Sequence, residues 1–572
     1  MSANPIGWDW RTCKVTGLTV DRSAERLIVF NAVTAVLYLA FGGTLALLIA
    51  LTRWPKMHLI SNAEWFYRLV GAHGAAMLIF WILFFEVAGL LFGGSILLSR
   101  RLTAPKMGWL AYVMMLVGSL GVTYTMLSGQ ATVMFTAYPP LKASALFYGM
   151  MLLYAVGALV AVLHFLVNIV TARLQGQVRT LPLFTFALLV AAILALFTLV
   201  SGTLAILPAF LWRLGVIDHV DPAAYRLLFW GFGHGAQQVN LAAMIGIWYA
   251  LASLTMGAKP INEGLSRFAF VLYVLFIQLG SMHHILVDPG LSSWARGLNA
   301  SYFMYAAVMG SMIHAFTIPA SMEVAARERG HTKGLFGWLK SAPWGQPAFA
   351  AMIISFVMFG VLGGISGVIM GGIQLNMIAH NTLIVPAHFH MTVVAGTTLA
   401  FMGMTYILVP LMVRRDLFLP GWARLQPYLY GLGMLLFGIG MGLAGHYGVP
   451  RRHWDITFPS MTQLSGGVYD GANIHWSLAL MALGATIAVT AGAMYIVVAA
   501  GTVFIGRKND VPNIGHVEAS AVTPTDPNAP VHHPKGFEAP GTMMLATGFL
   551  VLFILLYGWS WFELSKVSWI IK

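Results

Sequence analysis

The strongest chemical signature in this chain is a pair of histidines, His388 and His390, separated by a single residue at the start of a long apolar segment, residues 391–413. In an α-helix, positions two apart point about 200° away from each other. One helix can therefore present an imidazole to each of two planar cofactors on its opposite sides. The alternative is a pair of interfacial histidines that hydrogen-bond to neighbouring carbonyls, although histidine inside a membrane is uncommon and usually functional.

The composition indicates the kind of element that must position these side chains. The chain has 572 residues, of which 59% are hydrophobic and only 9% are charged. Many apolar runs reach about twenty residues without strand-like alternation, so we expect an all-α, polytopic membrane protein in a lipid bilayer. The net charge of +13 comes from short loops between these runs, which argues against a nucleic-acid partner. A single cysteine, Cys13, excludes disulfides and cysteine-based metal clusters within the chain.

About thirteen membrane spans are predicted within residues 28–563, and together they form a single membrane-embedded catalytic domain, 1–572. Residues 507–540 interrupt this pattern and are predicted to be a solvated linker. Residues 1–26 have no early apolar core, so no cleaved signal peptide is expected. Placing the N-terminus in the cytoplasm puts most of the 32 Lys and Arg residues on the inner side and the C-terminus outside. The predicted span limits are 28–51, 69–98, 108–128, 145–171, 183–211, 228–256, 268–287, 299–322, 347–372, 386–413, 428–446, 475–504 and 541–563.

This topology predicts that six histidines from four spans share one depth, toward the outer face of the membrane. Unrelated core histidines have no reason to align in this way, so the common depth favours one buried metal and cofactor site. The six are His73, His234, His283, His284, His388 and His390.

Neutral imidazole is a good ligand for iron and copper. A low-spin heme takes two axial histidines, a reactive heme takes one and leaves a face open, and a histidine-bound copper takes three. These requirements add up to the six histidines found, although counting alone does not assign a ligand to each metal.

Several motifs occur in the order found in one enzyme family and cover nearly the whole chain. On these motifs the chain resembles catalytic subunit I of the heme–copper oxidase superfamily, most closely its ba-type (B-family) branch. They are Tyr138-Pro139-Pro140-Leu141-Lys142, Leu228-Phe229-Trp230-Gly231-Phe232-Gly233-His234, His283-His284 followed by Asp288-Pro289-Gly290, Gly334-Leu335-Phe336-Gly337-Trp338, His380-Asn381-Thr382, His388-Phe389-His390 and Pro450-Arg451-Arg452.

The resemblance implies a low-spin heme, expected to be b-type, between His73 and His390, and a high-spin a- or b-type heme on His388. It implies copper on the remaining three histidines, with iron as the alternative metal, because histidine ligation does not choose between them. Arg451 and Arg452 match the family pair that binds heme propionates, and arginine suits bidentate pairing with carboxylates. His380 resembles a family histidine near those propionates. The copper ligands implied are His234, His283 and His284.

The sequence departs from the oxidase pattern at Gln238, which replaces a tyrosine four residues after the first copper ligand and one helical turn from it. In the oxidases that phenol supplies the fourth electron for one-step cleavage of dioxygen, and an amide cannot supply it. Coupling two molecules of nitric oxide to nitrous oxide needs only two electrons and two protons. The leading prediction is therefore nitric oxide reduction, in which Gln238 and Gln237 hydrogen-bond the bound gas. The alternatives are a terminal oxidase that reduces dioxygen, or nitric oxide dismutation.

In the family that the chain resembles, a channel from the cytoplasmic side brings protons to the site. The positions matching the family channel are Ile245, Tyr249, Ser311, His314 and Thr317, so one tyrosine of that channel is absent. Glu86 is an intramembrane acid and a second proton-relay candidate. Its alternative role is a hydrogen-bonded acid between helices. A weakened channel predicts little or no proton pumping.

Electrons must come from another protein, since the chain has neither a copper-binding cysteine cluster nor a Cys-x-x-Cys-His heme motif. We expect a subunit II-like partner at the outer face, reduced by cytochrome c or a blue-copper protein (a cupredoxin), with quinol as the less favoured donor. The expected location is the bacterial inner membrane. A non-catalytic heme subunit or a transporter is the alternative class, but neither has any use for three copper ligands.

Overall fold

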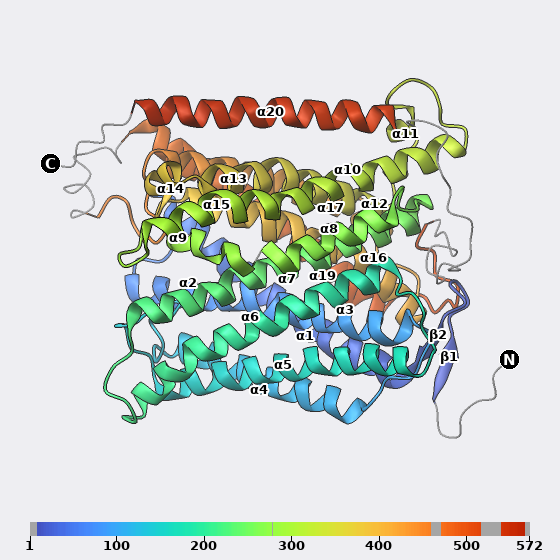
Figure 1. Cartoon of the computed structure of the whole chain (residues 1–572), viewed down its shortest axis with the longest axis horizontal. Coiled ribbons are helices and arrows are strands. Elements are labelled where there is room, and N and C mark those ends of the chain that lie inside the picture. Colours follow the sequence, from blue (N-terminus) through green and yellow to red (C-terminus); the bar gives the residue numbers. More distant parts are fainter. Residues whose placement is uncertain (1–8, 277, 459–470, 516–538, 567–572) are drawn as a thin grey trace.

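The computed structural model describes residues 9–276, 278–458, 471–515 and 539–566. Long helices lie side by side with their axes roughly aligned, which is the arrangement expected of a membrane-spanning bundle (Figure 1). In this part of the chain twelve helices are long and apolar enough to cross a membrane. They are α1 (Arg22–Arg53), α2 to η2 (Ala63–Ile96), α4 (Pro105–Leu127), α5 (Ala145–Leu174), α6 (Leu183–Arg213), α7 (Pro222–Met256), α9 to α10 (Ser293–Glu328), α12 to α13 (Pro347–Gly371), α15 to α16 (Ile384–Val413), α17 (Pro420–His446), α19 (Ala472–Phe504) and α20 (Pro540–Ser565).

The seventh predicted span, 268–287, is a bent pair rather than one straight helix. It consists of α8 (Glu263–Phe276) and the 3₁₀ helix η3 (Gln278–Ile285), with a bend of 57°. Counting the pair as one span gives thirteen, so the predicted all-helical, polytopic class is confirmed. Hydrophobicity alone could not show the bend, because both halves are apolar.

Several spans contain π-helical turns, which often occur at functional sites because they rotate the side chains that follow. In the second span, α2 (Ala63–Ala75) is followed by η1 (Ala76–Phe80), α3 (Trp81–Leu91) and η2 (Phe92–Ile96). The tenth span contains α15 (Ile384–Phe389), η6 (His390–Thr398) and α16 (Leu399–Val413). Others carry α9 (Ser293–Leu298), η4 (Asn299–Phe303), α10 (Met304–Glu328), α12 (Pro347–Val357), η5 (Met358–Gly364) and α13 (Ile365–Gly371), while α11 (Gly337–Lys340) and α14 (Ile373–Ala379) are short connecting helices.

Close packing of α17 on α19 fixes one side of the bundle. A β-carbon added at Gly440 or Gly484 would collide with backbone atoms of the opposite helix. Small residues at such contacts allow membrane helices to approach closely, because lipid provides no hydrophobic force between them.

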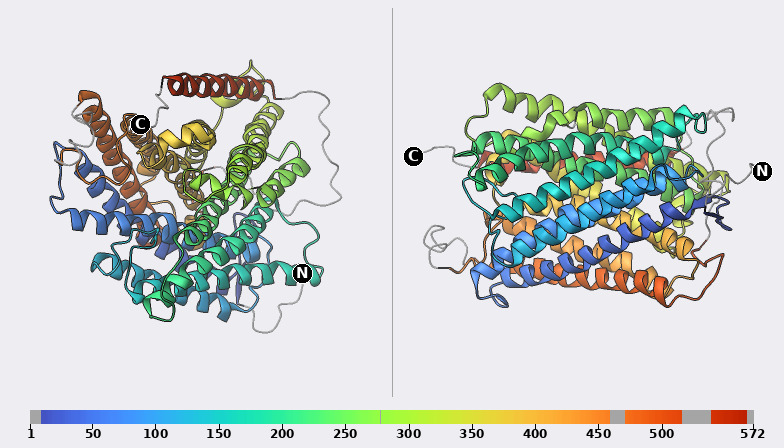
Figure 2. Two further views of the ribbon diagram at one scale, coloured as in Figure 1. Left: turned by 60° about the vertical axis from the view of Figure 1, so that its left-hand side comes forward. Right: turned by 90° about the horizontal axis from the view of Figure 1, so that it is seen from below.

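The last helix, α20, lies at the edge of the bundle, as Figure 1 and the left view of Figure 2 show. Glu323 of α10 fixes its first turn: the backbone N–H groups of Gly541 and Thr542 donate to the Glu323 carboxylate at 3.0 and 2.6 Å. A carboxylate at this position satisfies N–H groups that have no partner within the helix and complements the helix dipole.

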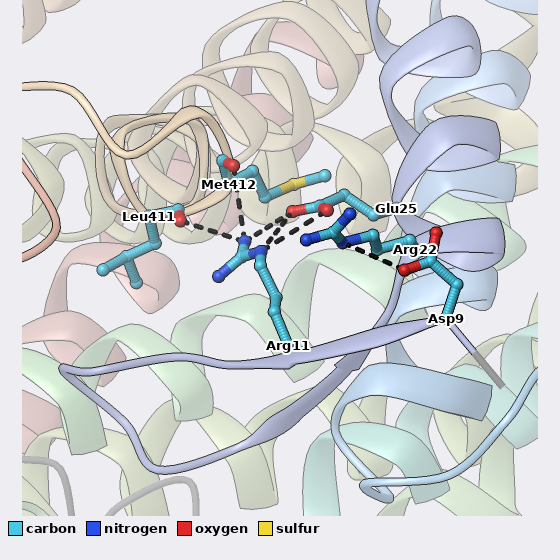
Figure 3. Close-up of polar contacts among 6 residues, drawn as sticks. All are labelled: Asp9, Arg11, Arg22, Glu25, Leu411 and Met412. Carbon is cyan, nitrogen blue, oxygen red and sulfur yellow. Dashed lines mark hydrogen bonds and ion pairs between the residues drawn. The ribbon is translucent and has the colours of Figure 1, made fainter. Parts of the chain in front are cut away.

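A short hairpin of β1 (Trp10–Thr12) and β2 (Thr19–Asp21) precedes α1 at one end of the bundle (Figure 1), and Figure 3 shows its polar contacts. Arg11 pairs with Glu25 of α1, and its Nη2 donates to the carbonyls of Leu411 and Met412 at 3.3 Å each. These carbonyls lie in the last turn of α16, where they lack N–H donors within the helix. The hairpin therefore ties the start of α1 to the end of the span that begins with His388 and His390.

Within the predicted solvated linker, 507–540, the described residues 507–515 are mostly exposed and hydrogen-bond to the loop between α16 and α17. Asp416 donates its backbone N–H to the Arg507 carbonyl at 2.9 Å, and the Asn509 N–H donates to the Arg414 carbonyl at 2.9 Å. Ile514 is buried. Residues 507–515 thus pack along the loop between α16 and α17, because their backbone groups find partners there. The rest of the predicted linker, 516–538, lies outside the described residues.

Candidate active site

His73 of α2 and His390 of η6 face each other across a gap the size of a metal ion. Their ring centroids lie 6.4 Å apart and their planes differ by 12°. A metal–imidazole bond is about 2 Å long, so two rings with an iron between them have centroids roughly 6 Å apart. The spacing and alignment of this pair therefore fit two axial ligands of one low-spin heme.

Both rings are oriented by a backbone carbonyl on the side away from the gap. His73 Nδ1 donates to the Gly42 carbonyl of α1 at 2.9 Å, and His390 Nδ1 donates to the Pro386 carbonyl at 2.6 Å. A hydrogen bond of this kind fixes the tautomer and leaves Nε2 as the metal-binding atom.

His388 is oriented in the same way but toward different elements. Its Nδ1 lies 3.0 Å from the Gly363 carbonyl of η5 and 3.1 Å from Ser366 Oγ. A β-carbon on Gly367 would come within 2.8 Å of the His388 ring, so glycine permits the close approach of α13. His388 and His390 thus project from different sides of their helix, as their spacing predicts.

The other three histidines form a compact triad of potential metal ligands. One nitrogen from each of His234, His283 and His284 lies within 4.8 Å of the other two. His234 Nδ1 is 3.1 Å from His284 Nε2, and His283 Nδ1 is buried without a hydrogen-bond partner among the described residues. Rings packed this closely, with a buried donor or acceptor left unpaired, fit a three-histidine metal site.

Gln238 points at this triad from one turn further along α7. Its Nε2 lies 3.4 Å from His234 Nε2, while its Oε1 is buried with no hydrogen-bond partner in the described part of the chain. A buried amide oxygen without a partner is costly, and a group in the adjacent cavity can satisfy it. On the other side of the triad, the Trp230 ring stacks on His284 at 4.1 Å with an angle of 6°.

One cavity of about 940 Å³ joins all of these groups. Residues of α1, α2, α7, α10, η5, α13, α15, η6 and α20 line it, and the lining is largely apolar. The sequence-predicted residues along its walls are His73, His234, Gln237, Gln238, His283, His284, Ser311, His314, His380, His388, His390, Arg451 and Arg452.

At one end of the cavity, the loop after α17 carries Arg451 and Arg452. The Arg451 N–H donates to the Asn381 carbonyl at 2.8 Å, and the Leu383 N–H donates to the Val449 carbonyl at 2.9 Å, so this loop is paired with the segment leading into α15. This pairing holds the arginines beside the segment that continues into His388 and His390.

These arginines are partly buried and form no ion pair among the described residues. Burial, reinforced by the charge of Arg452, lowers the pKa of Arg451 to about 10. Burial and then the charges of Arg451 and Arg226 lower the pKa of the nearby His380 to about 4. Arg226 pairs with Asp288, but Arg451 and Arg452 have no acidic partner among the described residues, which favours an anionic ligand such as the carboxylate of a heme propionate.

Sequence reasoning did not single out Arg53, in the last turn of α1. The residue is 7% exposed and lines the cavity, with Nη2 donating to the Arg451 carbonyl at 2.8 Å. Arg53 ends an apolar run, and charged residues commonly border membrane spans, so its position in the sequence gives no functional signal. Only its contact with the 451–453 loop, about 400 residues away in sequence, distinguishes it.

The predicted channel residues are brought together between α7, α8 and α10. Tyr249 Oη lies 2.6 Å from Thr317 Oγ1 and 3.0 Å from His314 Nδ1. Ser311 is 2.9 Å from the Tyr273 hydroxyl, and Ser266 accepts from Tyr249 at 3.0 Å. The sequence reasoning missed Ser266 and Tyr273 because α8 contains no motif.

Comparison with known proteins now defines the family. The family described as "Cytochrome C and Quinol oxidase polypeptide I" matches residues 26–487. The chain belongs to this family. Cytochrome c oxidase subunit 1 of Thermus thermophilus is 31% identical over 417 residues, which cover 70% of this chain and 71% of the relative. Its counterpart in Synechocystis is 23% identical over 486 residues, covering 78% and 82%.

A solved heme–copper terminal oxidase dimer shares the fold of this subunit I chain. The TM-score is 0.80 at 25% sequence identity, and the match covers 97% of this chain and 94% of the other. The chain is therefore a heme–copper oxidase subunit I, and membership implies hemes and a histidine-bound copper. The His234, His283 and His284 cluster fits that copper site.

We expect acid to lower the folding stability of the protein through His453, which lies in the same loop as Arg451 and Arg452. Burial and then the charge of Arg53 lower the pKa of His453 from 6.5 to about 3. The unfolded chain takes up a proton at this residue below its ordinary pKa and the folded chain does not. The stabilisation is therefore complete above pH 6.5 and declines as the pH falls toward 3.

At about pH 5, His453 should lower the free energy of unfolding by about 2 kcal/mol relative to neutral pH. Thermal unfolding of the purified protein at both pH values checks this effect, with His453→Gln as the variant that lacks the titrating group. Equal acid sensitivity in both proteins would contradict the assignment to His453.

Proposed function

We propose that this chain is the catalytic subunit of a membrane reductase that accepts electrons at one face of the bilayer and reduces a diatomic gas. A subunit II-like partner, reduced by cytochrome c or a cupredoxin, would supply the electrons. His73 and His390 would hold the low-spin heme that accepts them, and His388 would hold the high-spin heme. Phe389 joins the two ligands in sequence, and its ring stacks on His390 at 4.9 Å.

For the gas, we propose nitric oxide, which is reduced to nitrous oxide. The supporting observation is Gln238, whose amide reaches the His234 ring at 3.4 Å from the position where the family oxidases carry a redox-active phenol. Coupling two nitric oxide molecules needs two electrons, which a heme iron and a copper ion can supply together when bound. An amide suffices at Gln238 because no electron is required from that side chain.

The protein's own residues contribute position and polarity. Gln238 has a buried carbonyl oxygen without a partner among the described residues and an amide nitrogen beside His234. It can therefore donate a hydrogen bond to a bound gas molecule and accept one from the water that is formed. The apolar walls of the cavity favour entry of an uncharged gas and limit access of bulk water.

Dioxygen is the second candidate, and the names of the relatives support it more directly, because those proteins are cytochrome c oxidases. An oxidase lacking the phenol needs another oxidisable side chain at the site. Trp230, stacked on His284, is an aromatic ring in contact with the triad. Reduction of dioxygen in this protein would therefore be expected to depend on Trp230.

The test is turnover of the purified complex with each gas, nitric oxide under anaerobic conditions and dioxygen separately, using one reduced donor. We expect one nitrous oxide for every two nitric oxide molecules consumed, with dioxygen turnover at least about tenfold slower. The Gln238→Tyr variant should lose nitric oxide turnover, with the same substitution at Gln177, an exposed residue in the loop after α5, as the control. Rapid dioxygen consumption with negligible nitrous oxide would overturn this proposal and support the second candidate.

The remaining assignments belong to the same proposal: the bacterial inner membrane as the location, a cytoplasmic N-terminus, and a b-type low-spin heme. The polar cluster around Tyr249 would carry protons from the cytoplasmic side. Partly buried, unpaired cations near His380 suit the heme propionates at the opposite end of the cavity.

A further inference from the structure

Glu86 of α3 is a buried acid that the channel around Tyr249 does not include. The residue is 7% exposed and forms no ion pair within the described ranges. Its partner is Asn240 of α7: with the amide nitrogen turned toward the acid, Asn240 donates to Glu86 Oε1 at 2.8 Å and to the Ala236 carbonyl at 3.1 Å. A buried carboxyl group held by an amide rather than by a cation can exist in either protonation state.

Asn240 suits both states of this acid. Its nitrogen donates to an ionised carboxylate, whereas the opposite rotation of the amide places its oxygen against a protonated carboxyl, which can then donate. An amide rotation therefore follows each loss or gain of a proton without breaking the contact between α3 and α7.

The same asparagine borders the active-site cavity. Asn240 and Ala236 line the large cavity together with Gln237 and Gln238. Asn240 lies six residues beyond His234 on α7, a rise of roughly 9 Å. The partner of Glu86 thus separates the acid from the space in which the gas is reduced.

On its other side, Glu86 lines a second, small cavity of about 40 Å³ between α3, α5, α6 and α7. Thr198 of α6 lines this space too, and its buried hydroxyl has no hydrogen-bond partner among the described residues. The volume is sufficient for a water molecule, which needs two or more polar partners. Glu86 and Thr198 provide them.

Beyond this space lies a smaller cavity of about 10 Å³, which shares Val87 and Leu90 with it and reaches His164 and Asn168. The backbone N–H of Thr103 donates to Asn168 Oδ1 at 2.7 Å. Asp21 of the N-terminal hairpin accepts from the neighbouring Leu102 N–H at 2.7 Å. The series of cavities therefore leads from the end of the bundle that carries the N-terminal hairpin toward Glu86.

We propose that Glu86, positioned by Asn240, delivers protons to the metal centre by a route separate from the Tyr249 cluster. The carboxyl O–H bond breaks, its proton passes through the large cavity to the reduced gas, and the carboxylate is reprotonated from the Thr198 side. Glu86 exchanges no electrons. This inference rests on the proposed gas-reducing function but not on which gas is reduced.

The test compares Glu86→Gln, Glu86→Asp and Asn240→Leu in the complete complex, using whichever gas the unmodified protein reduces. We expect Glu86→Gln to lower turnover by about 100-fold, in the range for loss of a proton-transfer group, and Glu86→Asp to recover part of it. Glu64→Gln serves as the carboxylate-to-amide control, because the Glu64 side chain is 63% exposed and lines none of these cavities. Heme spectra and copper content should stay unchanged, which separates this effect from loss of the centre.

A second readout does not require turnover. The infrared difference between oxidised and reduced protein should contain a carboxylic C=O band that shifts in deuterated water and is lost in Glu86→Gln. A full band in that variant, or turnover above half of the unmodified level, would overturn the inference and leave Glu86 as a link between helices. If the protein reduced neither gas but the band were lost in the variant, the proposed function would fail while the proton-exchanging role of Glu86 stood.

Discussion

Replacing His283 with alanine should abolish copper binding while both hemes stay in place. The residue contributes one of three nitrogens gathered within 4.8 Å, and its Nδ1 is buried without a partner among the described residues. Two remaining histidines cannot complete a three-ligand site. We expect copper to fall to near zero and turnover with either gas to fall by at least about 100-fold, since even residues that only orient ligands often contribute 10–100-fold. Metal analysis and steady-state turnover on one preparation measure both effects.

His446→Ala is the matched control for this substitution, because His446 is exposed at the end of α17 and does not line the cavity. It should retain copper and activity. Retention of a full copper complement by His283→Ala would show that the metal uses other ligands, and the triad would then lose its assignment.

The second large effect concerns the two histidines that lie two residues apart. His390→Ala should remove the low-spin heme signal, because His73 alone cannot provide both axial ligands across the 6.4 Å gap. His388→Ala should instead remove the high-spin heme and leave the low-spin spectrum intact. Both variants should reduce turnover to the background level. Absorption spectra of the reduced proteins, together with heme extraction, distinguish the two outcomes.

Each of these two variants serves as the control for the other, since they alter the same short segment of the chain. Loss of the same heme in both variants would contradict the assignment of one ring to each heme. Loss of both hemes in both variants would indicate a folding defect, and free imidazole would then be needed to restore each heme separately.

The sequence was sufficient to find the six histidines because membrane topology converts position in the chain into depth. His73, His234 and His283 come from different spans, yet all line one cavity, as their common predicted depth requires. Their motifs also led to the family, whose match over residues 26–487 confirms it. The assignment to the ba-type branch stays a prediction.

The supporting groups could not be found in this way. The carbonyls that orient the heme ligands belong to Gly42 and Gly363, and any residue type carries a carbonyl, so sequence gives no signal for them. Asn240 and Arg53 depend on contacts between segments far apart in the chain, which spacing along one helix does not reveal.

The bend between α8 and η3 has a similar explanation. Hydropathy measures whether a segment can enter the bilayer, but the direction of its axis depends on packing against neighbouring helices. The contacts of residues 507–515 also depend on a segment distant in sequence, because their backbone hydrogen bonds are made with Asp416 and Arg414.

The central claim is that six imidazoles hold two hemes and one copper in a single chain, and cofactor analysis of the purified complex tests it most directly. Heme extraction and metal analysis should give two hemes and one copper in this subunit, with one low-spin and one high-spin heme in the spectrum. Any copper bound by a partner subunit is subtracted by measuring His283→Ala in parallel. Two hemes with neither copper nor a third iron at the triad would contradict the account and favour a protein that only transfers electrons.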